Sequence, residues 1–443
     1  MLFENVVDAG LCTHCGTCVG LCGGSLELRE TGKGLLPFSR AEFSKANDEA
    51  AYAACPGKGL YYPSLNDFVF NQQPSNWLLG CFRKAFIGYS LLPDIRRNAA
   101  SGGIITQTLL YLLEHKLIEG AVVVRTGVHK PWEAEPVIAT TPEEIRAASQ
   151  SVYVPVPVNR LLGQMESFKG RLAYVGLPDQ VASLRHLQQA GHKGALKVEY
   201  VIGPYVGTMM YFNAIQSYLR SNGVRDINDV VELRYRAGEW PGYLLIKLRS
   251  GRELRAEKFY YNYLIPFYIT QSSLLSVDFT NELTDISVGD AWQPKYESQR
   301  QGFSVVVARS EKGERLLSAM QSEGVAQLDE VTVDEALSMH GHMLDFKKRG
   351  AFIRIRWRAL LHKRIPDFGY RPTRIPVIRT VVEIIIVALF GICRTAGARW
   401  IVERMPLSLI GPLFNTLRKS WKNLSKPAKR KGLARYSVEF LPQ

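Results

Sequence analysis

The sequence predicts a protein of mixed α+β and α/β class in three parts: a small N-terminal domain over residues 1–72, a mixed-sheet body over 80–345 and a helical tail over 346–443. Three observations support this division. Five of the seven cysteines fall within the first 55 residues, strand and helix patterns alternate through the body, and the excess positive charge is confined to the last quarter. With 46% hydrophobic residues, the 443-residue chain can bury a sizeable core, which excludes wholesale disorder.

The N-terminal domain is defined by closely spaced cysteines. Cys12, Cys15 and Cys18 follow one another at two-residue gaps, Cys22 comes after three further residues, and Cys55 stands before a proline. A cubane iron–sulfur cluster needs four converging thiolates, and a C-x2-C-x2-C loop with one remote cysteine can supply them. We therefore expect a ferredoxin-like domain with one [4Fe–4S] cluster on Cys12, Cys15, Cys18 and Cys55. Cys22 is the rival for the fourth position.

The alternative metal for these cysteines is structural zinc. Zinc sites favour paired C-x2-C knuckles with a longer separation, and three cysteines at two-residue gaps fit that pattern poorly. Gly16 and Gly20 lie where a loop that wraps a cluster needs conformational freedom and close approach. His14 lies inside the same loop, where we expect it to tune or shield the cluster rather than to bind it. The pattern favours iron–sulfur over zinc.

The body alternates strand and helix patterns. Residues 99–116 begin with a glycine turn and continue as an amphipathic helix. The βαβ alternation that follows predicts a sheet with helices packed on it. The expected strands are 118–124, 171–176, 196–203 and 304–310, the further expected helices are 180–190, 206–222 and 311–320, and the expected hairpin is 230–255.

The tail combines positive charge with apolar stretches. From residue 347 to 443 it has 22 Lys and Arg against 4 Asp and Glu, whereas the preceding chain is mildly acidic. Apolar stretches at 384–393 and 405–417, with Trp400 and Trp421 nearby, suit a helix that lies in the headgroup region of an anionic membrane. The uncharged run over 384–393 is too short for a span, which needs about 20 apolar residues.

The tail therefore indicates docking on an anionic membrane surface or on a membrane-bound partner. The alternative is an ordinary buried helix pair with a solvated basic face. Nucleic acid is not favoured as a partner, because the tail has no aromatic-interleaved RNA motif and no DNA-reading unit. The sequence opens without a signal-peptide pattern, so the expected location is the cytoplasm, peripheral to the inner membrane face.

Five short blocks of the body are distinctive together. They are 100–103 (ASGG), 149–155 (SQSVYVP), 175–185 (VGLPDQVASLR), 235–242 (YRAGEWPG) and 278–292 (DFTNELTDISVGDAW). With the N-terminal cysteines, and in this order, they resemble the coenzyme F420 hydrogenase/dehydrogenase beta-subunit family over about residues 5–345. That family includes deazaflavin-reducing hydrogenase and dehydrogenase subunits and plant and bacterial chlorophyll-pigment reductases.

The resemblance implies FAD beside iron–sulfur clusters and a flavin-binding body. The segment 101–103 opens a helix, whose free N–H groups can hold a phosphate. Gly176 and Pro178 lie at the C-terminal end of a strand, where open α/β sheets bind ligands. The residues expected at the flavin are Ser101, Gly102, Gly103, Ser151, Tyr153, Gly176, Pro178, Gln180, Asp285, Gly289 and Asp290.

Departures from the family pattern are informative. Asp179 stands where the family commonly has a cysteine, Ser273 and Ser276 stand at a common C-x2-C pair, and a further family cysteine near Tyr205 is missing. In two-cluster members such cysteines hold a second cluster, so their joint absence argues that this protein lacks it. A carboxylate has a titratable proton that a cluster ligand lacks, so Asp179 is the candidate acid or base beside the flavin.

The expected function is an iron–sulfur flavoprotein oxidoreductase. It would relay electrons from ferredoxin, or from the reduced deazaflavin coenzyme F420, through FAD to a two-electron acceptor. The tail suggests a membrane-associated substrate, such as a prenyl-linked glycan intermediate or an apolar pigment. The alternative is a non-catalytic electron-transfer or docking subunit of a larger complex. His340 and His342 have an unusual spacing but no partner ligands near them in sequence, which indicates a structural role.

Overall fold

The computed structural model describes residues 1–40, 42–257 and 262–442. Within them, the strands of the central sheet are β3 (Lys84–Ser90), β4 (Gly120–Thr126), β5 (Ala134–Ala139), β6 (Leu172–Val175), β7 (Val198–Pro204), β11 (Ile286–Asp290), β12 (Ser304–Ala308) and β13 (Ala326–Glu330). Their order is β13-β3-β12-β11-β7-β6-β4-β5. The neighbours β4, β6, β7 and β11 are parallel, and the other strands join antiparallel. The expected mixed sheet is confirmed.

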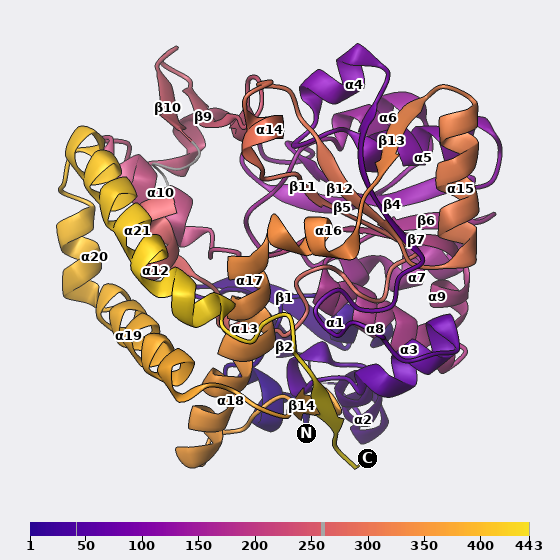
Figure 1. Cartoon of the computed structure of the whole chain (residues 1–443), viewed down its shortest axis with the longest axis horizontal. Helices are drawn as coiled ribbons and strands as arrows, with labels where there is room; N and C mark the ends of the chain where they lie inside the picture. The colour runs from indigo at the N-terminus through magenta and orange to yellow at the C-terminus, as the bar shows by residue number, and fades with distance from the viewer. Residues whose placement is uncertain (41, 258–261, 443) are drawn as a thin grey trace.

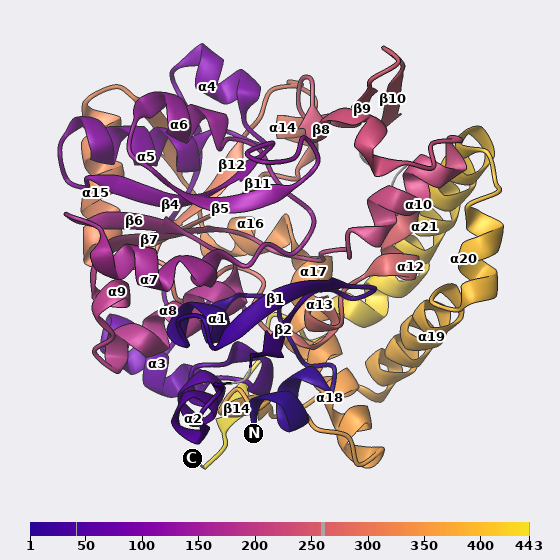
Figure 2. The ribbon, with the colours of Figure 1, turned by 180° about the vertical axis from the view of Figure 1, so that it is seen from behind.

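Helices cover both faces of this sheet (Figures 1 and 2). On one face, α5 (Ile104–Glu114), α6 (Pro142–Ala147) and α15 (Glu311–Ser322) pack in a core that includes Leu112, Val123 and Leu317. On the other face, α7 (Leu162–Ser167), α8 (Pro178–Gln189) and α9 (Lys193–Leu196) pack in a core with Val122 and Leu184. Val122 and Val123 are neighbours on β4. Successive side chains of a strand point to opposite faces of the sheet, so the two valines belong to different cores.

The N-terminal domain packs on the α8 face. Its elements are η1 (Phe3–Val7), α1 (Thr17–Leu21), the antiparallel pair β1 (Leu26–Thr31) and β2 (Gly34–Ser39), α2 (Lys45–Ala53), η2 (Pro56–Lys58) and α3 (Tyr62–Phe70). Leu11 and Leu65 share one hydrophobic core with Leu184 of α8. The small domain is therefore fused to the body by a common core.

A second, smaller sheet lies beside the main one. It holds β8 (Val230–Ala237), β9 (Tyr243–Leu248) and β10 (Glu253–Glu257), all antiparallel, so the expected hairpin gains a third strand. The helix expected over 206–222 begins only at α10 (Asn213–Ser221). Residues before it are held in extended form, because Met210 donates its N–H to the Tyr153 carbonyl and Met209 donates its N–H to Ser273 Oγ.

Connecting segments complete the body. They are α4 (Pro93–Asn98), η3 (Val158–Leu161), η4 (Ile227–Asp229), η5 (Asn262–Leu264), α12 (Ile265–Tyr268), α13 (Gln271–Leu275), α14 (Pro294–Glu297), α16 (Val333–Ser338), α17 (Gly341–Asp345) and η6 (Phe346–Gly350).

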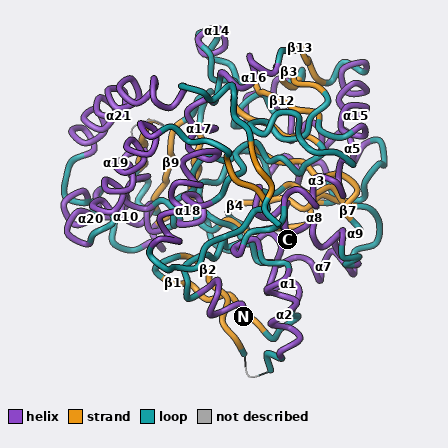
Figure 3. The backbone as a smooth tube through the Cα atoms, turned by 60° about the horizontal axis from the view of Figure 1, so that its bottom comes forward, coloured by secondary structure: helices purple, strands orange, loops and turns teal. Residues whose placement is uncertain are grey.

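The tail is helical, as expected. Its elements are α18 (Ala351–Leu360), α19 (Val377–Cys393), α20 (Ala396–Val402), α21 (Leu407–Arg430) and the antiparallel pair β14 (Tyr370–Pro372) and β15 (Val438–Phe440). Figures 1 and 3 show α19, α20 and α21 as a layer at one side of the molecule. Ile355 and Tyr370 belong to the core that Leu11 shares with Leu184 of α8, so the tail after residue 346 packs into the same core as the preceding chain. In the described part of the chain, the length and apolar character of each helix fall short of a membrane span.

Candidate functional site

Four of the five N-terminal cysteines come together in the structure. Cys15 and Cys55 are buried and Cys12 and Cys18 are partly buried, and burial raises the pKa of each thiol, that of Cys12 to about 12. Negative charge on neighbouring thiols also raises the pKa of Cys18, and the neighbours that contribute are Cys15, Cys55 and Cys12. Cys22 lies apart, where its thiol donates to the Asn47 carbonyl at 3.6 Å. These mutual charge effects link the first three cysteines with Cys55 and do not extend to Cys22.

The cysteine loop is held tightly against η3. A Cβ added at Gly20 would lie 2.1 Å from the Asn159 carbonyl oxygen, and one at Gly16 would lie 2.8 Å from the Pro157 oxygen. Gly16 also has a φ of 85°, which favours glycine. Asn159 donates its backbone N–H to the Cys15 carbonyl at 2.9 Å. Both glycines therefore allow the cysteine loop to approach the 157–162 segment closely, whereas their expected role in wrapping a cluster stays a prediction.

Helix α8 bridges the two cysteine segments. Thr17 Oγ1 lies 2.8 Å from Ser183 Oγ, and Ser183 donates to the carbonyl of Ala54, directly before Cys55. Thr17 Oγ1 also lies 3.2 Å from the Cys15 sulfur. One turn of α8 thereby fixes the loop and the remote cysteine relative to each other. No three His, Cys, Asp or Glu side chains of the described residues form a site for a single metal ion.

A large cavity lies at the carboxyl edge of the parallel strands. Its volume is about 1780 Å³, and it is lined by Val124, Gly176, Pro204 and Asp290, which lie at or near the C-terminal ends of β4, β6, β7 and β11. This is the edge at which open α/β sheets bind ligands. Gln180, in the first turn of α8, lines the same cavity. Helix α8 therefore contacts both the cavity, through Gln180, and the cysteine segments, through Ser183.

Most of the expected flavin residues line this cavity. They are Ser101, Gly103, Ser151, Tyr153, Gly176, Gln180, Gly289 and Asp290. Gly102 and Pro178 lie beside lining residues without lining the cavity themselves. Asp285 lies at the opposite end of β11, where it pairs with Arg185 at 3.1 Å. Burial raises the pKa of Asp285, but Arg185 and Lys312 outweigh it and lower the pKa below its usual value. The geometry gives Asp285 a structural role.

The first turn of α5 faces the cavity. Gly103 precedes the helix with a φ of 81°, and Gly103 and Ile104 both line the space. The loop is fixed by Ser304 of β12, whose Oγ accepts the Gly102 N–H at 2.9 Å and lies 2.8 Å from Ser101 Oγ. The first N–H groups of an α-helix have no partner within the helix and attract anions. This end of α5 suits a phosphate.

The small sheet closes another side of the cavity. Arg236 of β8 pairs with Asp290 at 3.1 Å and donates Nε to the Pro241 carbonyl at 3.0 Å. Trp240 donates its indole N–H to Asp290 at 3.4 Å, and its ring lies 4.9 Å from that of Trp292. The GEWPG turn and the end of the DISVGD strand, distant in sequence, thus meet on one wall.

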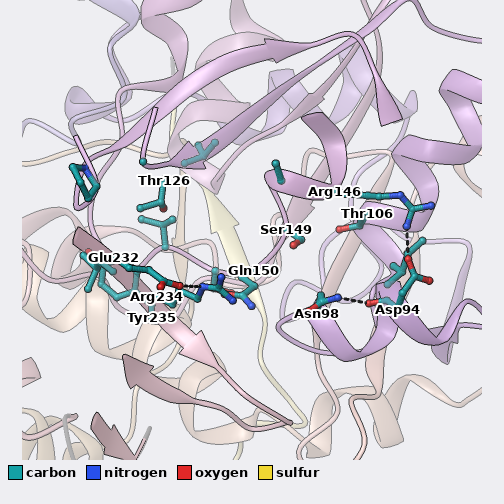
Figure 4. Close-up of a pocket in the computed structure, with 18 of the residues that line it drawn as sticks. Asp94, Asn98, Thr106, Thr126, Arg146, Ser149, Gln150, Glu232, Arg234 and Tyr235 are labelled. Carbon is teal, nitrogen blue, oxygen red and sulfur yellow. Dashed lines mark hydrogen bonds and ion pairs between the residues drawn. The ribbon is translucent and has the colours of Figure 1, made fainter. Parts of the chain in front are cut away.

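A second pocket of about 550 Å³ adjoins the cavity (Figure 4). Ser149 and Gln150 line both spaces. Figure 4 shows them between Glu232 and Arg234 on one side and the Asp94–Arg146 ion pair on the other. Gln150 has a φ of 79°, a conformation that side chains other than glycine rarely adopt and that often marks a functional segment.

Asp179 lies in the first turn of α8, where its charge acts on the Cys15 thiol, and it is not among the residues that line the cavity. Burial raises its pKa to about 6, although the cation of Lys347 opposes the shift. Burial lowers the pKa of Lys347 to about 7, and its Nζ donates to the Ser273 carbonyl at 2.9 Å. The carboxyl group of Asp179 also raises the pKa of Cys15. A buried acid–base pair therefore lies next to the thiols.

Tail residues form one whole wall of the cavity, which the sequence did not predict. Ile385 and Leu389 of α19, and Leu417 and Trp421 of α21, line it together with His342 of α17. These segments are more than 100 residues beyond the glycine loop at 101–103. The only sequence signals were the amphipathic pattern of the tail and the His-Gly-His spacing.

The fold and the site define a class: an α/β protein with a cofactor-sized cavity at the carboxyl edge of its sheet and buried thiols beside it. Residues 85–163 match the model of the coenzyme F420 hydrogenase/dehydrogenase beta subunit N-terminal region, and 169–334 match that of its C terminus. The two matches span more than half of the chain, which belongs to this family.

Three similar proteins have names that refer to F420. The coenzyme F420-dependent sulfite reductase of Methanocaldococcus jannaschii is 24% identical over 80% of this chain, which spans only 54% of that protein. The coenzyme F420 hydrogenase subunit beta of Methanothermobacter thermautotrophicus is 25% identical over 56% of this chain and 84% of its own. A solved chain of the F420-reducing [NiFe] hydrogenase complex from Methanosarcina barkeri aligns with a TM-score of 0.51 at 21% identity, covering 64% of this chain and 94% of that one. This last likeness shows the fold.

Proposed function

We propose that the protein is an iron–sulfur flavoprotein oxidoreductase. The observation that carries this is the shared helix α8: its Ser183 contacts Thr17 of the cysteine loop, and Gln180 in its first turn lines the large cavity. Relatives named as oxidoreductases or as subunits of them support a redox function. Electrons would come from ferredoxin or from reduced coenzyme F420, and a two-electron acceptor would receive them.

The thiols are the donor set that a [4Fe–4S] cluster needs. Burial raises the pKa of Cys12, Cys15, Cys18 and Cys55, so these side chains do not become thiolates without a bound cation. Four such thiols, two buried and two partly buried, suit a metal cluster, which is held by thiolates. We assign the cluster to these four and leave Cys22 outside it.

The cavity is large enough for FAD. Its volume of about 1780 Å³ exceeds the about 300–1,000 Å³ of ordinary ligand pockets. The α5 end would hold the phosphates, while Gly176 and Gly289, against which Tyr174 and Tyr205 pack closely, would line the sheet edge beside the ring. When bound, the cluster would supply one-electron transfer and the flavin would couple it to two-electron chemistry. Asp179, held beside the thiols, would exchange a proton there rather than at the flavin.

The tail would hold the protein at an anionic membrane surface. Large apolar side chains are exposed along α19, α20 and α21, and basic residues accompany them, a composition suited to the headgroup region. The exposed apolar residues are Val377, Ile378, Val381, Ile384, Ile385, Leu389, Ile392, Trp400, Ile401, Leu409, Leu413, Leu417 and Leu424.

The test is an anaerobic absorption spectrum of the purified chain, with iron, sulfide and flavin quantified on the same sample. We expect about four irons and one flavin per chain for a single [4Fe–4S] flavoprotein. Iron without flavin would identify an electron-transfer subunit without substrate chemistry instead. Zinc in a colourless protein would overturn the assignment of the cysteines.

A further inference from the structure

The tail wall of the cavity is positively charged. The Lys and Arg side chains that line it from α21 are Arg418, Lys419, Lys422, Lys426, Lys429 and Arg430. Of the described residues, only two carboxylates line the cavity, Asp290 and Glu297, and Asp290 already pairs with Arg236 at 3.1 Å. This wall therefore has an excess of cations that face a shared space.

The cations are arranged on one face of the helix. Lys422, Lys426 and Lys429 are four and three residues apart, which places them side by side on α21. Burial lowers the pKa of Lys422 and of Lys429. Burial also lowers the pKa of His342 to about 3, and repulsion from the Lys422 cation is the second cause of that shift. Like charges at this spacing repel each other. A bound anion would relieve that repulsion.

An apolar seam lies next to this charge. Ile385 and Leu389 of α19, and Leu413, Leu417 and Leu424 of α21, line the cavity and are also 48–78% exposed. Helices α19 and α21 are in contact and run side by side in Figure 1. Both helices therefore present apolar side chains to the cavity, where they would contact the hydrocarbon chain of a ligand.

The dimensions leave room for a second ligand. A cavity of about 1780 Å³ is larger than one ligand of ordinary size requires, since such pockets measure about 300–1,000 Å³. The residues expected at the flavin lie at the sheet edge, whereas the cations and the seam lie on the tail side. One continuous space thus joins two regions of different chemistry.

We propose that the tail side binds a long-chain amphiphile that carries a phosphate. Its hydrocarbon chain lies in the seam between α19 and α21, its phosphate contacts Lys422, Lys429 and His342, and its head group extends toward the sheet edge. This rests on the proposed function, because the head group would be the two-electron substrate of that site. The charge selects an anionic amphiphile over a neutral apolar pigment.

The experiment is isothermal titration calorimetry on the holoprotein with three probes: farnesyl phosphate, farnesol and inorganic phosphate. We expect farnesyl phosphate to bind at least tenfold more tightly than either of the others. The double variant K422Q/K429Q should bind farnesyl phosphate at least tenfold more weakly. The variant K363Q removes an exposed lysine of the tail that does not line the cavity, and it should bind like the wild type.

A second variant tests the seam. L413N/L417N should weaken binding of farnesyl phosphate and leave any binding of inorganic phosphate unchanged. Equal affinity for inorganic phosphate would mean a soluble anion site, and equal affinity for farnesol an apolar one; either overturns the inference. Iron and flavin are measured on the same samples, so a missing cofactor counts against the proposed function, and weak binding to a fully loaded protein counts only against this inference.

Discussion

Arg379 of α19 lies 2.6 Å from Asp345 of α17, and both side chains are fully buried. Arg379 also pairs with Glu383 on its own helix at 2.7 Å, and Glu383 pairs with Arg354 of α18. A buried charge network thus joins the tail helix to the body. Because the cavity lies between the tail and the sheet, this network also fixes the position of the cavity wall.

Arg379→Ala should destabilise the protein by about 3–5 kcal/mol, because it removes the shared cation of a buried network and leaves Asp345 with Arg349 alone and Glu383 with Arg354 alone. Chemical denaturation followed by circular dichroism measures the free energy of unfolding. The control is Arg371→Ala, which breaks an exposed pair with Glu439 and should cost about 0–1 kcal/mol. Equal losses in both variants would show that the network does not anchor the tail.

The cysteine assignment predicts a sharp division. Serine at Cys12, Cys15, Cys18 or Cys55 should each reduce iron and sulfide content to well below the wild-type ratio, since the cluster loses one of its four ligands. Cys22→Ser is the matched control, because Cys22 is buried in the same domain but lies apart from the other four. Full iron in the Cys55→Ser variant together with loss in Cys22→Ser would reverse the choice of the fourth ligand.

Gly20→Ala tests the packing of the cysteine loop. The new Cβ would lie 2.1 Å from the Asn159 oxygen, so the loop must shift, and overpacking of this kind costs about 1–3 kcal/mol. Iron content and the midpoint of thermal unfolding should both fall. Gly163→Ala is the control, since Gly163 is also helical and has no neighbouring atom within 4 Å of a Cβ. It should leave the iron content unchanged and should not lower the midpoint, since alanine is the better helix former.

Much of the fold could be predicted from the sequence, because local patterns set it. Alternating apolar residues and glycine turns gave the strands β6 and β7 and the helices α5 and α8 within a few residues. The helix expected from Val206 failed at its start, because hydrogen bonds from Met209 and Met210 to distant segments override local propensity.

The candidate site could be predicted only in part, because sequence spacing reveals local motifs but not tertiary contacts. The cysteine loop and the glycine turn at 101–103 are local motifs, so sequence spacing revealed them. Lys422 and His342 reach the cavity only through tertiary packing, and a charge count over the tail cannot show which cations face inward. Asp285 was misplaced because the DISVGD motif spans a whole strand, whose two ends lie at opposite edges of the sheet.

The exposed apolar layer predicts binding to vesicles. Trp400 and Ile401 of α20 are 57% and 55% exposed, and burial of such side chains in a bilayer surface contributes about 1.5–3 kcal/mol each. Their joint replacement by serine should weaken cosedimentation with phosphatidylglycerol vesicles at least tenfold. Leu196→Ser is the control, because Leu196 is 59% exposed on α9, on the far side of the molecule from α20 (Figure 1). Unchanged binding by the double variant would refute docking through this layer.

Asp179 predicts a pH dependence of stability. Burial raises its pKa from 3.8 to about 6, so between about pH 4 and pH 6 the folded state holds this proton more firmly than the unfolded state does. The stability contributed by this group is therefore complete below pH 4 and is lost as the pH rises through 6. Lys347, whose pKa is lowered to about 7, acts in the opposite direction and only above that pH.

Asp179→Asn should remove this dependence. Urea unfolding at intervals from pH 4 to pH 7 would give the free energy of unfolding of both proteins, and the wild type should lose stability relative to the variant as the pH rises. The scale is about 1.4 kcal/mol for each unit of pKa shift. Parallel curves would mean that Asp179 is not perturbed by its surroundings.

Turnover of the same variant separates the two roles of this residue. Full activity with flavin and iron in place would leave Asp179 a structural acid and would exclude it as a proton donor.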